Sequence, residues 1–201
     1  MRNTIIYSLF NGLRDFFLWS KRGYSSPSPH FIKQSCLLRN GIPSATWVET
    51  GTFLGQTTQL LAKRGSFVFS IEPEPRLFDR ARILFSKNKN VKILNGTSED
   101  LLPTLLPSIV GDVNFWLDGH YSAGITFKGR HDTPILHELD SISNNIDHFG
   151  KICVSIDDVR CFQPRLKKYE AYPSLDTLVA WATKHHLYWH IEHDIFIATN
   201  Y

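Results

Sequence analysis

Acidic side chains follow several of the short apolar runs in this 201-residue sequence, and their positions suggest ligand binding. Glu49, Glu72, Asp118 and the pair Asp157 and Asp158 each stand at or just after the end of such a run. Carboxylates there can accept hydrogen bonds from hydroxyl groups or coordinate a hard divalent cation. Which of these they do depends on whether the fold brings them together.

A glycine-containing turn follows the first of these runs, with Glu49 at its start and glycines at 51 and 55. Such glycines let the backbone approach a ligand closely. Glu72 lies 21 residues after Gly51, a spacing at which nucleotide-binding folds place a carboxylate on the ribose hydroxyls. Phe53 interrupts the G-x-G-x-x-G pattern of dinucleotide folds, and no lysine follows Gly55 as in a P-loop. The spacing favours an adenosyl ligand, although a tight turn alone also explains the glycines.

Three carboxylates, Asp118, Asp157 and Asp158, are expected at the ends of neighbouring strands. Without a counter-ion they would repel one another and raise each other's pKa values. Carboxylate and water oxygens suit magnesium, so the three acids together predict a magnesium site. For Asp157 or Asp158 taken alone, a cap on the following turn is the simpler interpretation.

Alternating strands and helices must position these residues. Runs rich in β-branched and aromatic residues predict seven strands, over 45–49, 67–72, 91–95, 113–118, 152–157, 187–192 and 195–199. Longer segments predict helices over 4–19, 30–39, 54–64, 75–87, 98–108, 134–146 and 174–186, with Ser98 as a candidate N-cap. Two residues join the last two strands, which must therefore be antiparallel neighbours. The pattern predicts an α/β fold with a doubly wound, mostly parallel sheet of seven strands and a terminal antiparallel pair.

The N-terminal segment differs from the rest of the chain. Residues 1–44 are expected to form a helical appendage and linker, ahead of a ligand-binding domain over 45–201. Six basic residues and one acid give residues 1–40 a charge of +5, whereas the remainder carries −2. The apolar residues of the first helix gather near one face. We expect this helix to pack on the domain or on a second subunit, as in a homodimer, and a helix on a membrane surface is the alternative.

Composition and charge exclude several classes of protein. Apolar residues make up 42% of the chain and charged residues 20%, as in an ordinary globular protein. No apolar run reaches the ~20 residues that span a bilayer. Three cysteines without a C-x-x-C spacing argue against a disulfide framework or a zinc finger, so a reducing, cytoplasmic location is expected. The charge of −2 outside residues 1–40 predicts no nucleic-acid partner.

These motifs resemble those of the class I S-adenosylmethionine-dependent methyltransferases. The resemblance rests on the turn from Glu49 to Gly55, on Glu72, on Gly-Thr-Ser-Glu-Asp over 96–100 and on Leu-Asp-Gly-His over 117–120. The three carboxylates resemble, more narrowly, the metal-dependent O-methyltransferases of the macrocin and catechol types. The resemblance implies a Rossmann-like sheet with S-adenosylmethionine and magnesium as cofactors. It also implies O-methylation of a hydroxyl on a small molecule or saccharide.

The resemblance further implies a role for each candidate residue. The implied cofactor-binding residues follow the first four strands and are Glu49, Gly51, Thr52, Gly55, Glu72, Ser98, Glu99 and Asp118. The residues of the first turn would hold the methionine part, the acid after the second strand the ribose, and the Ser-Glu pair the adenine. Asp118, Asp157 and Asp158 would bind magnesium. His120, two residues past the first metal ligand, would take the proton of the acceptor.

Three other interpretations fit the same residues. A methyltransferase without metal would leave Asp157 and Asp158 structural. A non-haem iron oxygenase would use His120, His131 and a carboxylate. A non-catalytic adenosyl-binding module would need the first turn and no base. The segment between Asp118 and Asp157 is longer than in the resembling families, so the identity of the acceptor is not implied.

Overall fold

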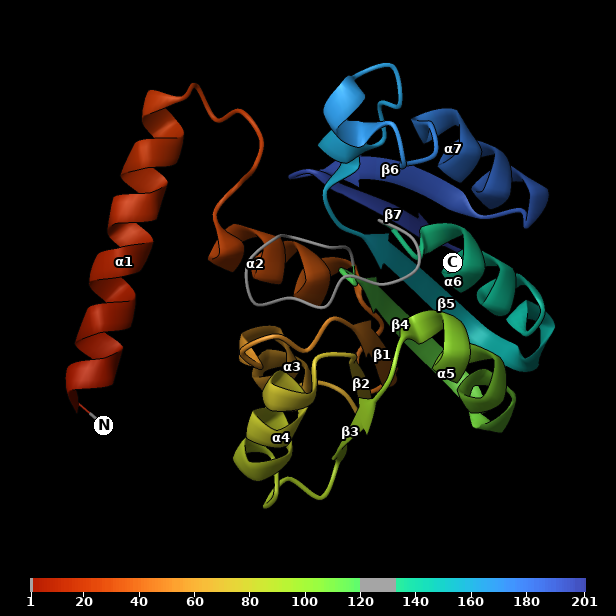
Figure 1. Cartoon of the computed structure of the whole chain (residues 1–201), viewed down its shortest axis with the longest axis horizontal. Helices are drawn as coiled ribbons and strands as arrows, with labels where there is room; N and C mark the ends of the chain where they lie inside the picture. The colour runs from red at the N-terminus through yellow and green to blue at the C-terminus, as the bar shows by residue number, and fades with distance from the viewer. Residues whose placement is uncertain (1, 120–132) are drawn as a thin grey trace.

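The computed structural model describes the backbone of residues 2–119 and 133–201, and side chains from residue 12 onward within those ranges (Figure 1). Seven strands form one sheet in the order β3-β2-β1-β4-β5-β7-β6. They are β1 (Thr46–Thr50), β2 (Phe67–Glu72), β3 (Val91–Asn95), β4 (Gly111–Leu117), β5 (Phe149–Ile156), β6 (Tyr188–Glu192) and β7 (Ile195–Thr199). β1 to β5 pair in parallel, and β7 runs antiparallel to β5 and β6. The predicted Rossmann-like sheet with its terminal antiparallel pair is confirmed.

Seven helices in the described residues connect and cover these strands. They are α1 (Arg2–Lys21), α2 (His30–Asn40), α3 (Gln56–Leu61), α4 (Pro75–Leu84), α5 (Ser98–Leu105), α6 (Ile135–Ser143) and α7 (Leu175–Lys184). Several end before their predicted limits. In α3 the last turn tightens, because the amides of Lys63 and Arg64 donate to carbonyls three residues back and not four.

The central strands are buried on both faces. Neighbouring strand residues point to opposite sides of a sheet, and here Val48 and Phe115 pack in a core with α5, α6 and α7. Trp47 and Trp116, one residue before and after them, pack on the other side with residues of α2 and α3. Two packed layers therefore fix β1 and β4, and with them the residues that follow their carboxyl ends.

The first two helices differ in how closely they pack against the sheet and its helices. Cys36 and Leu37 of α2 are buried in the smaller core. α1 lies apart from the sheet in Figure 1 and contacts the body near its C-terminal end, where the Trp19 ring packs 5.8 Å from that of His193. Its Leu13 and Phe17 side chains are exposed. Among the described residues, no helix combines the length and apolar character that crossing a membrane requires.

Candidate functional site

The carboxyl ends of the parallel strands bring the predicted site residues into one row. Thr50 of β1 pairs with Ile71 of β2 and with Leu117 of β4, and Leu117 pairs with Ile156 of β5. The residues that follow these positions, Glu72, Gly51, Asp118 and Asp157, therefore succeed one another along a single edge. This is the edge at which α/β sheets bind ligands.

Two glycines shape the turn after β1. Gly51 has φ +92°, and a Cβ there would lie 2.6 Å from the carbonyl oxygen of Asp118. Gly55 has φ +78°, and a Cβ would lie 2.8 Å from the Phe85 ring. Any larger side chain at 51 would push the turn away from the end of β4. The turn thus keeps its backbone close to the point where a ligand would meet both strands.

Glu49 is buried beneath this turn. Its Oε2 accepts hydrogen bonds from Thr58 of α3 and Ser70 of β2, both at 2.5 Å. Its other oxygen, Oε1, has no hydrogen-bond partner among the residues that the structure describes. Burial raises the pKa of Glu49 to about 7, against the opposing effect of the two hydroxyls. Thr52, also predicted to bind the cofactor, has its hydroxyl 2.6 Å from that of Ser70.

Glu72 ends β2 and ties down the same turn. Its two oxygens accept the backbone N–H groups of Phe53, at 2.7 Å, and of Glu74, at 3.0 Å. Phe53 has φ +48°, which is costly for a residue with a side chain, and the carboxylate contact helps to hold it there. Burial raises the pKa of Glu72, although the backbone donors oppose the shift.

The start of α5 holds the two residues predicted to bracket adenine. Ser98 is buried and Glu99 is half-buried beside it, with 3.4 Å between the Ser98 hydroxyl and a Glu99 oxygen. Ser98 is the first residue of the helix, and Thr97 occupies the N-cap position. The interpretation of Ser98 as the N-cap is therefore wrong by one residue.

A small hollow lies between the ends of β4 and β5. It encloses about 10 Å³, near the space of one water molecule. Its polar lining includes Asp157, Glu138 of α6 and Tyr172, next to Gly119. Burial raises the pKa of Tyr172 above its usual range, so its phenol stays protonated. The hollow adjoins the row of strand ends and is large enough for about one water molecule.

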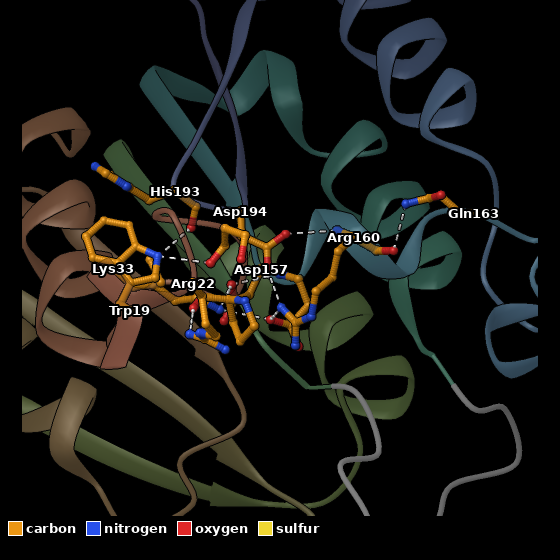
Figure 2. A network of polar contacts seen from close by, with 12 residues as sticks. Trp19, Arg22, Lys33, Asp157, Arg160, Gln163, His193 and Asp194 are labelled. Atoms are coloured by element: carbon orange, nitrogen blue, oxygen red, sulfur yellow. Dashed lines mark hydrogen bonds and ion pairs between the residues drawn. The ribbon is translucent and has the colours of Figure 1, made fainter. Parts of the chain in front are cut away.

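The acidic pair after β5 is already neutralised by basic side chains. The Lys33 ammonium of α2 donates to Asp157 at 2.5 Å and to Asp158 at 2.8 Å. Arg160 donates to Asp158 at 2.5 Å and also pairs with Asp194 in the β6–β7 turn. Burial opposes the charge on Lys33, but the two carboxylates outweigh it and raise the pKa of the ammonium. Figure 2 shows this network at the end of β5.

Magnesium does not fit these residues as predicted. The oxygens that would coordinate the ion accept hydrogen bonds from an ammonium and a guanidinium instead. Within residues 2–119 and 133–201, no group of three or more His, Cys, Asp or Glu side chains is placed to hold a metal ion. Asp118 and Asp157 do follow neighbouring strands, β4 and β5. The basic side chains that the structure places against Asp157 and Asp158 are Lys33 and Arg160.

Two histidines considered for catalysis, His120 and His131, lie outside the described residues. The role of His120 as a base therefore stays a prediction, as does the iron-binding alternative that uses both.

Sequence reasoning missed Lys33, Arg160, Asp194, Glu138 and Tyr172. Arg160 carried a usable signal, because it stands two residues after Asp158 and can fold back on it. Lys33 carried none, because it lies 124 residues from Asp157.

The chain was compared with protein families, with curated protein sequences and with solved structures. No family model and no curated protein sequence matches the chain. Structures of NodS, an N-methyltransferase from Bradyrhizobium japonicum WM9, resemble it with a TM-score of 0.54 at 13% identity, over 83% of this chain and 92% of NodS. The complex of NodS with S-adenosyl-L-homocysteine gives 0.53 at 14% identity, over 83% and 84% of the two chains.

Two further structures are similar at the same level. SMU.1697c from Streptococcus mutans, in complex with SAH, has a TM-score of 0.50 at 13% identity, over 85% of this chain and 96% of that one. The 23S rRNA methyltransferase ErmE also has a TM-score of 0.50, at 16% identity, over 83% and 66%. None of these three proteins is described as a metal-dependent O-methyltransferase. At such identities the likeness shows a shared fold, in which the reported acceptors differ.

Proposed function

We propose that this chain is an S-adenosylmethionine-dependent methyltransferase. The observation that carries the proposal is Glu49, a buried carboxylate at the ligand-binding edge whose Oε1 lacks a donor among the described residues. The ammonium group of an amino-acid ligand would donate to that oxygen, directly or through a water. The fold shared with NodS and SMU.1697c, both solved with S-adenosylhomocysteine, supports this choice of ligand.

The proposed cofactor site follows the ends of β1 to β4. It comprises Glu49, Gly51, Thr52, Gly55, Glu72, Ser98, Glu99 and Asp118. Glu72 remains suited to ribose although it holds the turn, because each carboxylate oxygen has two lone pairs and accepts one backbone N–H. Gly51 lets the turn after β1 pack directly against the Asp118 backbone, where a Cβ would lie 2.6 Å from the carbonyl oxygen.

The acceptor is proposed to enter from the side of the hollow. Bound S-adenosylmethionine supplies a methyl group activated on sulfur. The chain's own part is to orient a nucleophile toward it, which in well-oriented cases contributes ~7–11 kcal/mol. Asp157 and Tyr172 line the hollow with groups that hydrogen-bond to hydroxyls. We therefore propose an O-methyl acceptor, with His120 as the base.

A small molecule or saccharide is the proposed acceptor class. Residues 41–201 hold 16 basic and 18 acidic side chains, so the body lacks the net positive charge that attracts a phosphate backbone. Some proteins with this fold, such as ErmE, do act on rRNA. A panel of acceptors must therefore include RNA.

Magnesium is left out of the proposed reaction. The pair that would hold it, Asp157 and Asp158, has Lys33 and Arg160 as counter-charges. The three cysteines are buried and free, which fits a reducing compartment, and we propose a cytoplasmic location on that basis.

Calorimetry with S-adenosylhomocysteine tests the cofactor, and transfer of a labelled methyl group to glycans, phenols and RNA tests the reaction. We expect one equivalent of S-adenosylhomocysteine per chain and transfer to a hydroxyl acceptor. An adenosyl-binding module would bind the cofactor and methylate nothing. Failure to bind S-adenosylhomocysteine would reject the proposal and leave the iron oxygenase as the alternative.

A further inference from the structure

The contact between Lys33 and the end of β5 joins parts of the chain that are far apart in sequence. Lys33 lies in α2, and its ammonium contacts both carboxylates of the Asp157–Asp158 pair, at 2.5 and 2.8 Å. All three side chains are about nine-tenths buried. Figure 2 draws Lys33 and Asp157 in one network of polar contacts with Arg160 and Asp194. A contact so enclosed is not a chance meeting of surface charges.

The local backbone is shaped to present the pair to a cation. Asp158 adopts φ +57°, and the Asp157 Oδ1 that accepts from Lys33 also accepts the Asp158 N–H, at 2.7 Å. The amides of Val159 and Arg160 donate to the Asp194 carbonyl and carboxylate. Two turns, one after β5 and one between β6 and β7, are thereby locked around the acids.

The charges in this cluster explain why a cation is needed. Asp157, Asp158 and Asp194 bring three negative charges, and Lys33 and Arg160 bring two positive ones. Buried carboxylates are tolerated only when paired and hydrogen-bonded. A divalent ion at the ~2.0–2.1 Å that magnesium requires would contact the same oxygens and would face the ammonium at close range. The ammonium and the ion therefore exclude each other.

We infer that Lys33 is a resident cation that occupies the place of a divalent metal ion at the Asp157–Asp158 pair. Asp157 lines the small hollow on the side from which we propose that the acceptor enters, so Lys33 acts as a positioning residue that fixes this carboxylate. In this respect the inference rests on the proposed function: methyl transfer proceeds without a divalent ion at this site. It also makes α2 a part of the site.

Manganese binding tests this directly, because Mn²⁺ replaces magnesium on oxygen ligands and its free form is counted by electron paramagnetic resonance. The full chain is stripped with EDTA and titrated with MnCl₂. We expect no stoichiometric Mn²⁺ on the wild type or on Lys33→Arg, which keeps the positive charge. Lys33→Ala is expected to bind one equivalent, about a hundredfold more tightly than the wild type, because an adjacent like charge is gone.

Two further variants locate the binding. The double variant Lys33→Ala with Asp157→Asn is expected to lose the bound Mn²⁺, whereas Arg39→Ala, which removes an exposed cation of the same helix, is expected to bind none. One equivalent on the wild type that Asp157→Asn abolishes would overturn the inference. So would an absence of binding in Lys33→Ala, since Lys33 would then not be what excludes the ion.

Folding of the Lys33 variants is checked by circular dichroism, and Lys33→Gln, closer in volume, serves where Lys33→Ala does not fold. The wild-type titration needs no variant and can overturn the inference alone. S-adenosylhomocysteine calorimetry on the same samples separates the two proposals. If the wild type does not bind S-adenosylhomocysteine but the Mn²⁺ results are as expected, the methyltransferase proposal is rejected. The inference that Lys33 occupies the metal position then still stands.

Discussion

The two halves of the sheet's carboxyl edge treat their acids differently. At the ends of β1 and β2, Glu49 and Glu72 are held by hydroxyl and backbone N–H groups, and the described residues place no cation within ion-pair distance of them. At the end of β5, Asp157 and Asp158 are held by Lys33 and Arg160. All four carboxylates are buried. The halves therefore differ in the charge of the donors and not in exposure.

This difference indicates where a ligand is needed. Glu49 and Glu72 have only neutral donors among the described residues, whereas Asp157 has the Lys33 ammonium. Burial raises the pKa of all three carboxyl groups, so the halves differ in the charge of their partners and not in the direction of the pKa shift. A ligand with an ammonium or hydroxyl groups supplies what is missing. The β5 pair has its positive partners within the chain, so removing one of them should lower the free energy of unfolding.

The largest effect is expected for Lys33→Ala. Breaking a buried ion pair by removing one partner leaves uncompensated charge and typically costs ~3–5 kcal/mol in the free energy of unfolding. Arg39→Ala is the matched control, because Arg39 lies on the same helix and pairs with Glu192 at the surface, where such pairs contribute ~0–1 kcal/mol. Urea titration measures both.

A Lys33→Ala protein as stable as Arg39→Ala would contradict the comparison. It would mean that the β5 pair is compensated by Arg160 and solvent, and that the two halves of the edge are alike.

Cofactor binding should respond only to the first half. Glu72→Ala is expected to weaken S-adenosylhomocysteine binding by ~1–3 kcal/mol, through lost hydrogen bonds to a charged group. Asp157→Asn, a matched change at the other half, is expected to leave this affinity within about twofold. Calorimetry measures both constants. An equal loss of S-adenosylhomocysteine affinity in the two variants would mean that the cofactor contacts both halves of the edge. That result would contradict the proposed difference between the halves.

The positions of the strands and of their terminal acids were predictable from the sequence. Runs such as 113–118 and 152–157 are short and rich in apolar residues, as is typical of buried parallel strands. The carboxyl ends of parallel strands in one sheet share an edge. Hence the amino-acid pattern alone suffices to place Glu72, Asp118 and Asp157 together.

The partners of these acids could not be predicted. Lys33 lies on a helix in the basic N-terminal segment. Hydrophobic periodicity describes only local structure and cannot predict a contact between residues 124 positions apart. The acids therefore looked uncompensated, and magnesium was the natural hypothesis. The hydrogen bonds from the Ser70 and Thr58 hydroxyls to Glu49 could not be predicted either, because they depend on how β1, β2 and α3 pack together.

A pH titration of cofactor binding sharpens the contrast. The pKa of Glu49 is raised to about 7 by burial, and a ligand ammonium favours its charged form. S-adenosylhomocysteine affinity should therefore fall as pH drops below 7, by at most about tenfold per pH unit. Glu49→Gln should bind more weakly at pH 8 and should lose this dependence. Calorimetry at pH 6, 7 and 8 measures it, and an unchanged slope in Glu49→Gln would assign the effect to another group.

The same shift has a consequence for stability without ligand. The folded chain holds the Glu49 proton more tightly than the unfolded chain, whose carboxyl has the ordinary pKa of 4.5. The contribution of this proton to the free energy of unfolding is complete below pH 4.5 and is lost as pH rises through about 7. Glu49→Gln should remove that decline, which urea titrations at several pH values detect.

The smallest effect is expected for removal of residues 1–22. Both halves of the edge lie beyond this segment, and Lys33 stays in place, so S-adenosylhomocysteine affinity should change less than about twofold. Trp19 is lost from its contact with His193, which should lower stability modestly. The exposed Leu13 and Phe17 are also removed, so any homodimer that they support should dissociate in light-scattering measurements. A marked loss of cofactor affinity in the folded, truncated protein would show that α1 contributes to the cofactor site. The site would then include a helix in addition to the two halves of the sheet edge.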